Sequence, residues 1–164
     1  MGGSMGTDKG RWPLKKDSAW TEAQMLKWLD AQRIPLRIAV QSDNGIPIMC
    51  PLWYYPEAGS LWCATHRSAH IVSLLERSPA VAWEVAPNDM PYCGVRGQAD
   101  VSLHADKGEV VLRRLIDRYL GSEDNKLARF LLSRVDGEYA LELKPRWISC
   151  WDYGNRMSDL ESAQ

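Results

Sequence analysis

The stretch from Leu61 to Leu75 constrains the fold more than any other part of the sequence. Residues 61–65 form a short apolar run that is typical of a buried strand, and residues 71–75 place apolar side chains at helical spacing. Only a few polar residues separate the two, so the strand is predicted to lead directly into a helix. Ser68 stands just before the apolar part of this helix and is its predicted N-cap.

The strand-to-helix junction carries the groups that bind a phosphate. A helix N-terminus presents unpaired backbone N–H groups and the positive end of the helix dipole. Arg67 adds a guanidinium group, and Thr65 and Ser68 add hydroxyls. We therefore predict that this junction holds the phosphate of a cofactor. The alternative is that Ser68 is an ordinary helix cap, since serine is common at that position.

Composition excludes several classes of protein. The chain has 164 residues, which suits one domain with its own core, and its net charge is −1. Such a charge gives no electrostatic basis for binding nucleic acid or an anionic membrane surface. No apolar run is long enough to cross a membrane, and no signal-peptide pattern opens the sequence. We expect a cytoplasmic protein whose ligand is a small molecule.

The four cysteines are Cys50, Cys63, Cys93 and Cys150, and each is predicted to lie in a strand or at its edge. No two are spaced as C-x-x-C, and their spacing matches no zinc site, so no metal centre is predicted. We interpret them as reduced and mostly buried thiols, with a catalytic thiol as the alternative.

Short apolar runs separated by turn residues predict six strands. Asp43-Asn44-Gly45 is a strong hairpin turn, because Asn-Gly accepts positive φ angles at low cost. Gly94 and Gly97 lie inside a predicted strand and indicate that another group approaches the backbone closely there. The predicted strands span residues 36–42, 46–55, 61–65, 80–86, 92–103 and 139–150. Four helices are predicted. The first is capped by Thr21 and Gln24 and is ended by Pro35, and the second ends at Arg77. The other two span residues 105–119 and 124–134.

This order of elements predicts a mainly β fold of the α+β kind, a small closed or half-open barrel with helices around it. Residues 1–19 are predicted to form a loose arm, residues 20–154 a single domain, and residues 155–164 a polar tail.

Several pieces of the sequence, in their order and spacing, resemble the flavin-binding split-barrel family of pyridoxamine 5'-phosphate oxidase-like proteins. The pieces are Arg37–Val40, Asp43–Pro47, Pro51–Tyr54, Leu61–Thr65, Ser68–His70, Leu74–Pro79, Val95–Ala99 and Leu143–Trp147. The resemblance implies a six-stranded split β-barrel with flanking helices. It also implies a homodimer that binds FMN at the subunit interface.

The resemblance further implies which residues contact the cofactor. The second strand would lay its backbone against the isoalloxazine ring through Met49, Cys50, Pro51, Leu52 and Trp53. The junction would bind the phosphate through Thr65, Arg67, Ser68 and His70, and the partner subunit would contribute the segment around Trp151. The family commonly has lysine in place of His70, and histidine is charged only part of the time near neutral pH. This departure leaves the identity of the cofactor open.

Three functions stay open at this point. The first is an FMN-dependent oxidoreductase that exchanges hydride or electrons with a small-molecule substrate. The second is a reductase that uses a deazaflavin coenzyme, with Arg11, Lys15 and Lys16 as a source of charge for a longer cofactor. The third is a non-catalytic carrier of flavin or haem, with His66 and His70 as candidate haem ligands. The sequence shows no catalytic triad and no paired carboxylates, so the catalytic side chains are unassigned.

Overall fold

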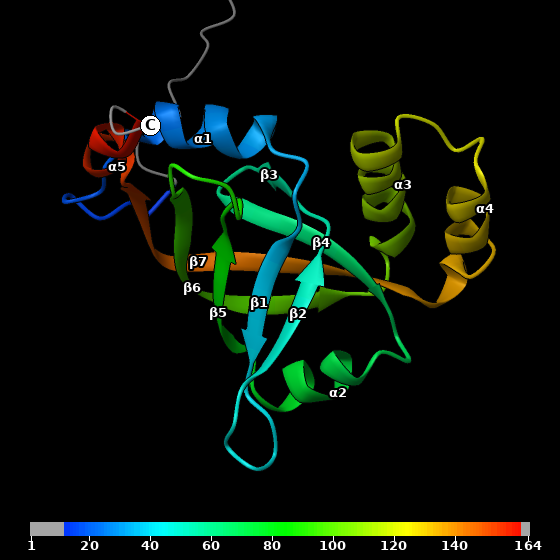
Figure 1. Cartoon of the computed structure of the whole chain (residues 1–164). Coiled ribbons are helices and arrows are strands. Elements are labelled where there is room, and N and C mark those ends of the chain that lie inside the picture. The colour runs from blue at the N-terminus through cyan, green and yellow to red at the C-terminus, as the bar shows by residue number, and fades with distance from the viewer. Residues whose placement is uncertain (1–11, 162–164) are drawn as a thin grey trace, which may run out of the picture.

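A computed structural model describes residues 12–161 of the chain. Seven strands form one antiparallel sheet in the order β2-β1-β5-β6-β7-β4-β3, and the sheet curls into a half-barrel (Figure 1). Helix α1 lies across one end of the barrel and α2 lies at the opposite end, while α3 and α4 stand together beside β4. The predicted split-barrel type of fold, mainly β with flanking helices, is confirmed.

The elements follow the predicted order closely. The strands are β1 (Leu36–Val40), β2 (Ile48–Leu52), β3 (Tyr55–Glu57), β4 (Ser60–His66), β5 (Ala80–Val85), β6 (Cys93–His104) and β7 (Glu138–Asp152). The helices are α1 (Glu22–Ala31), α2 (His70–Arg77), α3 (Gly108–Leu120), α4 (Lys126–Leu132) and α5 (Gly154–Glu161), and a 3₁₀ turn, η1, spans Val135–Gly137. None of the helices in the described range is both long and apolar enough to cross a membrane.

The core lies inside the barrel because the strands alternate between buried and outward-facing residues. In β1, Leu36, Ile38 and Val40 are completely buried, whereas Arg37 and Ala39 lie on the outer face. This period of two is the signature of a strand with one buried face. Helix α2 closes one end of the barrel with the apolar side chains that its sequence predicted.

The second predicted strand is two strands in the structure, so the sheet has seven strands rather than six. The chain leaves the ladder at Trp53 and Tyr54, between β2 and β3. The backbone N–H of Tyr54 donates to the Tyr119 hydroxyl at 3.2 Å, and the Tyr54 hydroxyl donates to the carbonyl of Leu29 at 2.8 Å. These contacts replace the ladder hydrogen bonds that a continuous strand would make.

The two glycines inside β6 mark close approaches, as predicted. A Cβ atom on Gly97 would lie 2.2 Å from the carbonyl oxygen of Trp147, and one on Gly94 would lie 2.6 Å from the ring of Trp151. Opposite this part of β6, β7 carries a bulge at Arg146, next to Pro145, which cannot donate a ladder hydrogen bond. The predicted interruption of the last strand at Pro145 is therefore a bulge inside one continuous strand.

Both ends of the described chain are more ordered than the sequence predicted. Trp12 is buried, Leu14 forms a β-bridge with Ile148, and the N–H of Lys15 donates to the carbonyl of Ile148 at 2.8 Å. Residues 12–19 of the predicted loose arm therefore pack against β7. The polar composition of this segment predicted a loose arm, but the apolar side chain of Trp12 anchors it. Residues 1–11 of that arm lie outside the described range. The predicted polar tail begins inside helix α5.

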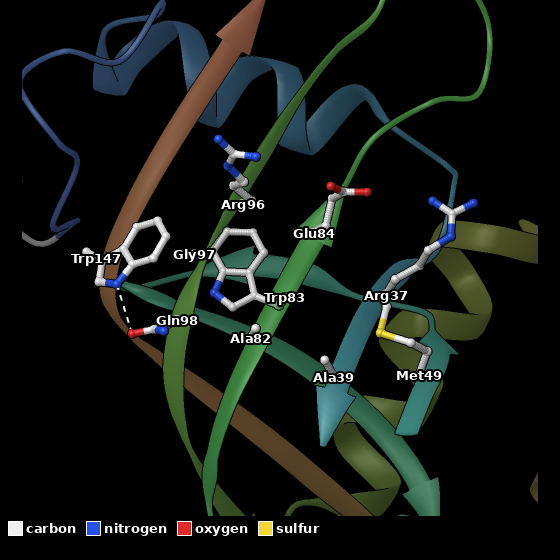
Figure 2. Close-up of a pocket in the computed structure, with 10 residues that line it drawn as sticks. All are labelled: Arg37, Ala39, Met49, Ala82, Trp83, Glu84, Arg96, Gly97, Gln98 and Trp147. Atoms are coloured by element: carbon white, nitrogen blue, oxygen red, sulfur yellow. Dashed lines mark hydrogen bonds between the residues drawn. The ribbon is translucent and has the colours of Figure 1, made fainter. Parts of the chain in front are cut away.

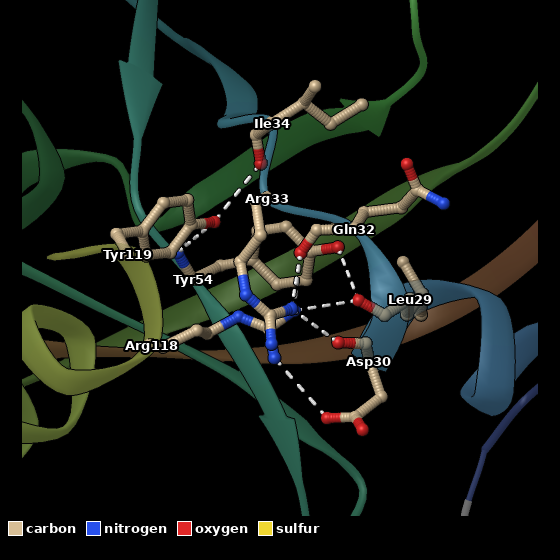
Figure 3. Close-up of polar contacts among 8 residues, drawn as sticks. All are labelled: Leu29, Asp30, Gln32, Arg33, Ile34, Tyr54, Arg118 and Tyr119. Carbon is tan, nitrogen blue, oxygen red and sulfur yellow. Dashed lines mark hydrogen bonds and ion pairs between the residues drawn. The ribbon is translucent and has the colours of Figure 1, made fainter. Parts of the chain in front are cut away.

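A buried arginine fixes α3 to the end of α1. The guanidinium of Arg118 donates to the carbonyls of Leu29 and Gln32 at 2.8 and 2.9 Å and lies over the ring of Tyr54 (Figure 3). Next to it, the Tyr119 hydroxyl donates to the carbonyl of Ile34 at 3.0 Å. Arg118 thereby caps a carbonyl in the last turn of α1 and the carbonyl of its C-cap residue, and Tyr119 bonds to the segment that follows the helix. Helix α3 is thereby held in a fixed position against the barrel.

Candidate functional site

The half-barrel is split between the edges of β2 and β4. Strand β2 is the last strand at one end of the sheet, and β3 pairs with β4 only as far as Trp62. Within residues 12–161, the remaining part of β4, Cys63–His66, pairs on one side only, with β7. Backbone N–H and C=O groups on such edges are free to bind a ligand.

A cleft of about 320 Å³ lies at this split, with α3 and α4 as its cover. Its lining comes from every element around it: Pro51, Leu52, Trp53, Ala64, Thr65, His66, Leu112, Leu115, Leu127, Leu131, Arg134 and Glu138. The volume is at the lower end of the range for small-molecule sites.

One part of the cleft is apolar and includes an aromatic wall. The ring of Trp53 stacks on the ring of Tyr119, with a centroid separation of 4.9 Å and an angle of 6° between the planes. Leu112 and Leu115 of α3 line the same cleft. A rigid, flat indole among aliphatic side chains suits a planar ligand.

The other end of the cleft is polar. Residues His66 and Glu138 are register partners at the ends of β4 and β7, and Arg134 lies beside them in η1's N-cap position. Desolvation, together with the guanidinium groups of Arg134 and Arg67, lowers the pKa of His66 below its ordinary value, so its imidazole is neutral near pH 7. Burial raises the pKa of Glu138, and Arg134 opposes that rise only in part.

The junction between β4 and α2 has a different local structure from the one predicted. The Ser68 hydroxyl lies 2.7 Å from Nδ1 of His66, and the Ser68 N–H donates to the same nitrogen at 3.2 Å. This local turn uses the Ser68 side chain, so the prediction that Ser68 caps the helix is wrong. Ala69 occupies the N-cap position, and no side chain caps α2.

The junction is also tied to the start of the last strand. The N–H of Arg67 donates to the carbonyl of Gly137 at 2.7 Å. A Cβ atom on Gly137 would lie 2.2 Å from Nε2 of His66, so a larger residue would displace the imidazole. The peptide backbone of Arg67 is therefore fixed, while its side chain is exposed.

The cleft brings together four of the ten predicted cofactor residues, namely Pro51, Leu52, Trp53 and Thr65. Arg67 and Ser68 follow directly at its polar end, and His70 is exposed in the first turn of α2. Cys50 packs against the core. Met49 and Trp151 are not among the residues that line the cleft.

Met49 instead lines a groove of about 370 Å³ on the outer face of the barrel (Figure 2). Across five strands, the register forms one row of five residues: Met49, Ala39, Ala82, Gln98 and Trp147. The two alanines are small, so the row is hollow in its middle. Met49 is 60% exposed, which leaves an apolar surface on this face.

Trp151 is in β7 and pairs with Gly94 near the start of β6. Its ring packs over Gly94, and the guanidinium of Arg96 lies 5.2 Å from the ring centroid. Within one subunit it does not line the cleft, so its predicted role depends on a partner subunit.

Sequence reasoning missed the contributions of Arg134, Glu138 and the leucines of α3 and α4. The helix pair was predicted, but nothing local in the sequence indicates that it covers the split between β2 and β4. Glu138 could have been noticed only as an acidic residue at the start of an apolar strand.

Thiol, metal and haem chemistry receive little support from the described residues. All four cysteines are free, and burial raises the pKa of the Cys150 thiol to about 11 and that of Cys63 further still. Between residues 12 and 161, no group of three or more acidic, histidine or cysteine side chains could hold a metal ion. Nδ1 of His66 is bonded to Ser68 and Nε2 lies against Gly137, so His66 is poorly placed to bind haem iron.

Comparison with solved structures places this geometry among known folds. A conserved hypothetical protein from Mycobacterium tuberculosis matches with a TM-score of 0.72 and 17% identity, over 85% of this chain and 89% of that one. An F420 reductase matches with a TM-score of 0.59 and 20% identity, over 75% and 94% of the two chains. A putative pyridoxamine 5'-phosphate oxidase from Listeria innocua matches with a TM-score of 0.58 and 11% identity, over 78% and 95%.

The chain has the split-barrel fold of the pyridoxamine 5'-phosphate oxidase-like proteins. At these identities the comparison shows the fold and not the reaction. No protein-family model and no curated protein matches the sequence.

Proposed function

We propose that this protein is a flavin-dependent oxidoreductase that binds FMN in the cleft between β2 and β4. The observation that carries the proposal is the division of the cleft into an apolar end with an aromatic wall and a polar end beside Arg67 and Arg134. FMN is divided in the same way, because a flat three-ring group is joined through a hydroxylated chain to a phosphate. Proteins of the same fold that are described as an F420 reductase, a putative pyridoxamine 5'-phosphate oxidase and an FAD-binding protein add support.

In this proposal the chain's own residues bind and orient the ligand. Trp53 and the leucines of α3 would cover the ring and exclude water from it. The unpaired edges of β2 and β4 would offer backbone donors and acceptors. Arg67, with the first N–H groups of α2, would hold the phosphate. The bound flavin would supply the hydride or electron transfer, so no acid–base triad is needed in the protein.

A second subunit is part of the proposal. The apolar row that runs from Met49 to Trp147 on the outer face offers a surface for a second copy of the chain. Exposed apolar patches of this kind commonly mark interaction sites. A homodimer would bring the Trp151 segment of one subunit toward the other, as the family resemblance implies.

A deazaflavin coenzyme is the second candidate, and the F420 reductase that shares this fold favours it. The coenzyme also joins a flat three-ring group to a hydroxylated chain, so the same cleft would bind it. Lys15, which the sequence suggested as a source of charge, lies over Trp147 beside the outer groove. It does not line the cleft, so it supplies no charge there.

The test is an absorption spectrum of the purified protein after incubation with FMN, the deazaflavin coenzyme or haemin and passage through a sizing column. A retained flavin spectrum at the elution volume of a dimer supports the proposal. Turnover of a reduced nicotinamide with an electron acceptor then separates an enzyme from a carrier. Retention of haemin alone, or of none of the three, would contradict the proposed function.

A further inference from the structure

Glu138 lies at the polar end of the cleft, and nothing in the described part of the chain pairs with its carboxyl group. Its residue is 8% exposed and lines the cleft. Among residues 12–161, no hydrogen bond or ion pair reaches its carboxyl group, and Arg134 acts on it only through space. The carboxyl oxygens of Glu138 are not among the fully buried side-chain atoms that lack a partner, so water reaches them through the cleft. A carboxylate that lines a cleft and has no protein partner keeps both oxygens available to a ligand that displaces this water.

A second carboxylate on the same strand shows what a structural role looks like here. Glu142 receives a hydrogen bond from the Ser60 hydroxyl at 3.0 Å, and its other oxygen lies 2.9 Å from Nε2 of His104. Both oxygens of Glu142 are therefore satisfied within the protein. The carboxyl group of Glu142 has hydrogen-bond partners in the protein, whereas Glu138 lines an open cleft instead.

Helix α3 shows where Glu138 lies along the cleft. Gly108, at the start of α3, lies against the backbone of Glu138, and Tyr119, near its end, stacks on Trp53. These two positions are about 16 Å apart along an α-helix. His66, the register partner of Glu138, immediately precedes Arg67. A ligand that extends from Trp53 towards the junction at Arg67 therefore passes the end of the cleft that Glu138 lines.

We propose that Glu138 accepts hydrogen bonds from the hydroxyl groups of the chain that links the flavin ring to its phosphate. This inference rests on the proposed function. A carboxylate is an acceptor with two oxygens, so it can bind two neighbouring hydroxyls together. The phosphate itself is an unsuitable partner, because a carboxylate repels it. FMN and the deazaflavin coenzyme share the hydroxylated chain, so the assignment holds for either.

The test compares riboflavin, which carries the hydroxylated chain but no phosphate, with lumiflavin, which carries only the ring system. Dissociation constants are measured by fluorescence titration for the wild-type protein and for Glu138→Leu, Glu138→Gln and Glu142→Gln. Glu138→Leu should weaken riboflavin binding about tenfold and leave lumiflavin binding unchanged. Glu138→Gln should lose less, because its amide oxygen still accepts, and Glu142→Gln should change neither ligand.

An equal loss for both ligands, or no loss for either, would overturn the role of Glu138 while leaving the proposed function in place. If the wild-type protein binds neither ligand, the proposed function fails first and the inference with it. Thermal unfolding checks that the carboxyl is unpartnered. Glu138→Leu should keep or raise Tm, since it removes a buried polar group, and a large fall in Tm would show a structural partner and overturn the proposal.

Discussion

At the end of α1, the guanidinium of Arg118 is only 9% exposed and donates to two backbone carbonyls, whereas the side chains of Arg67 and Arg134 beside the cleft are exposed. In the described part of the chain neither of the latter two makes an ion pair, and the guanidinium of Arg134 lies 5.8 Å from the centroid of the Phe130 ring. At the end of α1, the guanidinium charge makes contacts within the fold. Beside the cleft, the guanidinium charges are available to a ligand.

The same contrast holds for the carboxylates and the aromatic residues. Asp30 pairs with Arg118 at 3.3 Å, while Glu138 has no partner among residues 12–161. Tyr119 contributes to both regions, because its hydroxyl bonds to the chain after α1 and its ring stacks on Trp53. The structural region is not fully satisfied, because Nε of Arg118 is buried without a hydrogen-bond partner in the described part of the chain. The difference between the regions is that the free charges beside the cleft are open to a ligand, which is the usual mark of a binding site.

The largest effect is expected from removing the buried guanidinium. Arg118→Met should lower the free energy of unfolding by about 3 kcal/mol and Tm by about 6–12 °C, because two hydrogen bonds from a charged donor to the carbonyls of Leu29 and Gln32 are lost. Each carbonyl keeps one other donor, Tyr54 and Arg33 respectively. Chemical denaturation and calorimetry measure both quantities. The matched control is Arg113→Met on the same helix, which loses exposed ion pairs with Glu109 and Glu123 and should stay within about 1 kcal/mol of wild type. Equal losses in the two variants would contradict the structural role of Arg118.

A smaller loss of stability is expected from Tyr119→Phe, which separates the two roles of that residue. The variant loses the hydrogen bonds to Ile34 and Tyr54 but keeps a ring that can stack on Trp53. The free energy of unfolding should fall by about 1–2 kcal/mol. Flavin affinity, measured by titration, should be unchanged. A loss of affinity without a loss of stability would show that the hydroxyl serves the cleft instead.

A pH dependence is expected from Glu142. Burial alone would raise the pKa of Glu142, but hydrogen bonds with His104 and Ser60 outweigh it and hold the pKa below the ordinary 4.5. Because the folded-state pKa is the lower one, the stabilisation is complete above about pH 4.5 and is lost as the pH falls through the folded value. Plots of Tm against pH should therefore fall less steeply in acid for Glu142→Gln than for wild type. Parallel curves would mean that the pair contributes nothing to stability.

Local patterns in the sequence predicted most of the fold. Leu36, Ile38 and Val40 alternate with outward residues, Gly45 has the positive φ of 81° that the hairpin turn requires, and Thr21 with Gln24 forms the predicted capping box. Each of these features depends on residues that are close together in the chain, so the sequence displays it directly.

Contacts between distant residues account for what could not be predicted. The break after β2 depends on Tyr119, which is far along the chain from Tyr54. Glu138 reaches the cleft only because β7 pairs with β4 in a register that places it opposite His66. Ser68 fails as a cap for a local reason, since the imidazole of His66 competes for its hydroxyl.

The central claim is that the charge of Arg67 is available for a ligand phosphate, and a comparison of FMN with riboflavin tests it most directly. The two ligands differ only in the phosphate, so their dissociation constants are measured for wild type and for Arg67→Ala. The variant should bind FMN about tenfold more weakly, bind riboflavin as well as wild type, and keep the wild-type Tm. An unchanged affinity for FMN, or an equal loss for both ligands, would contradict the claim.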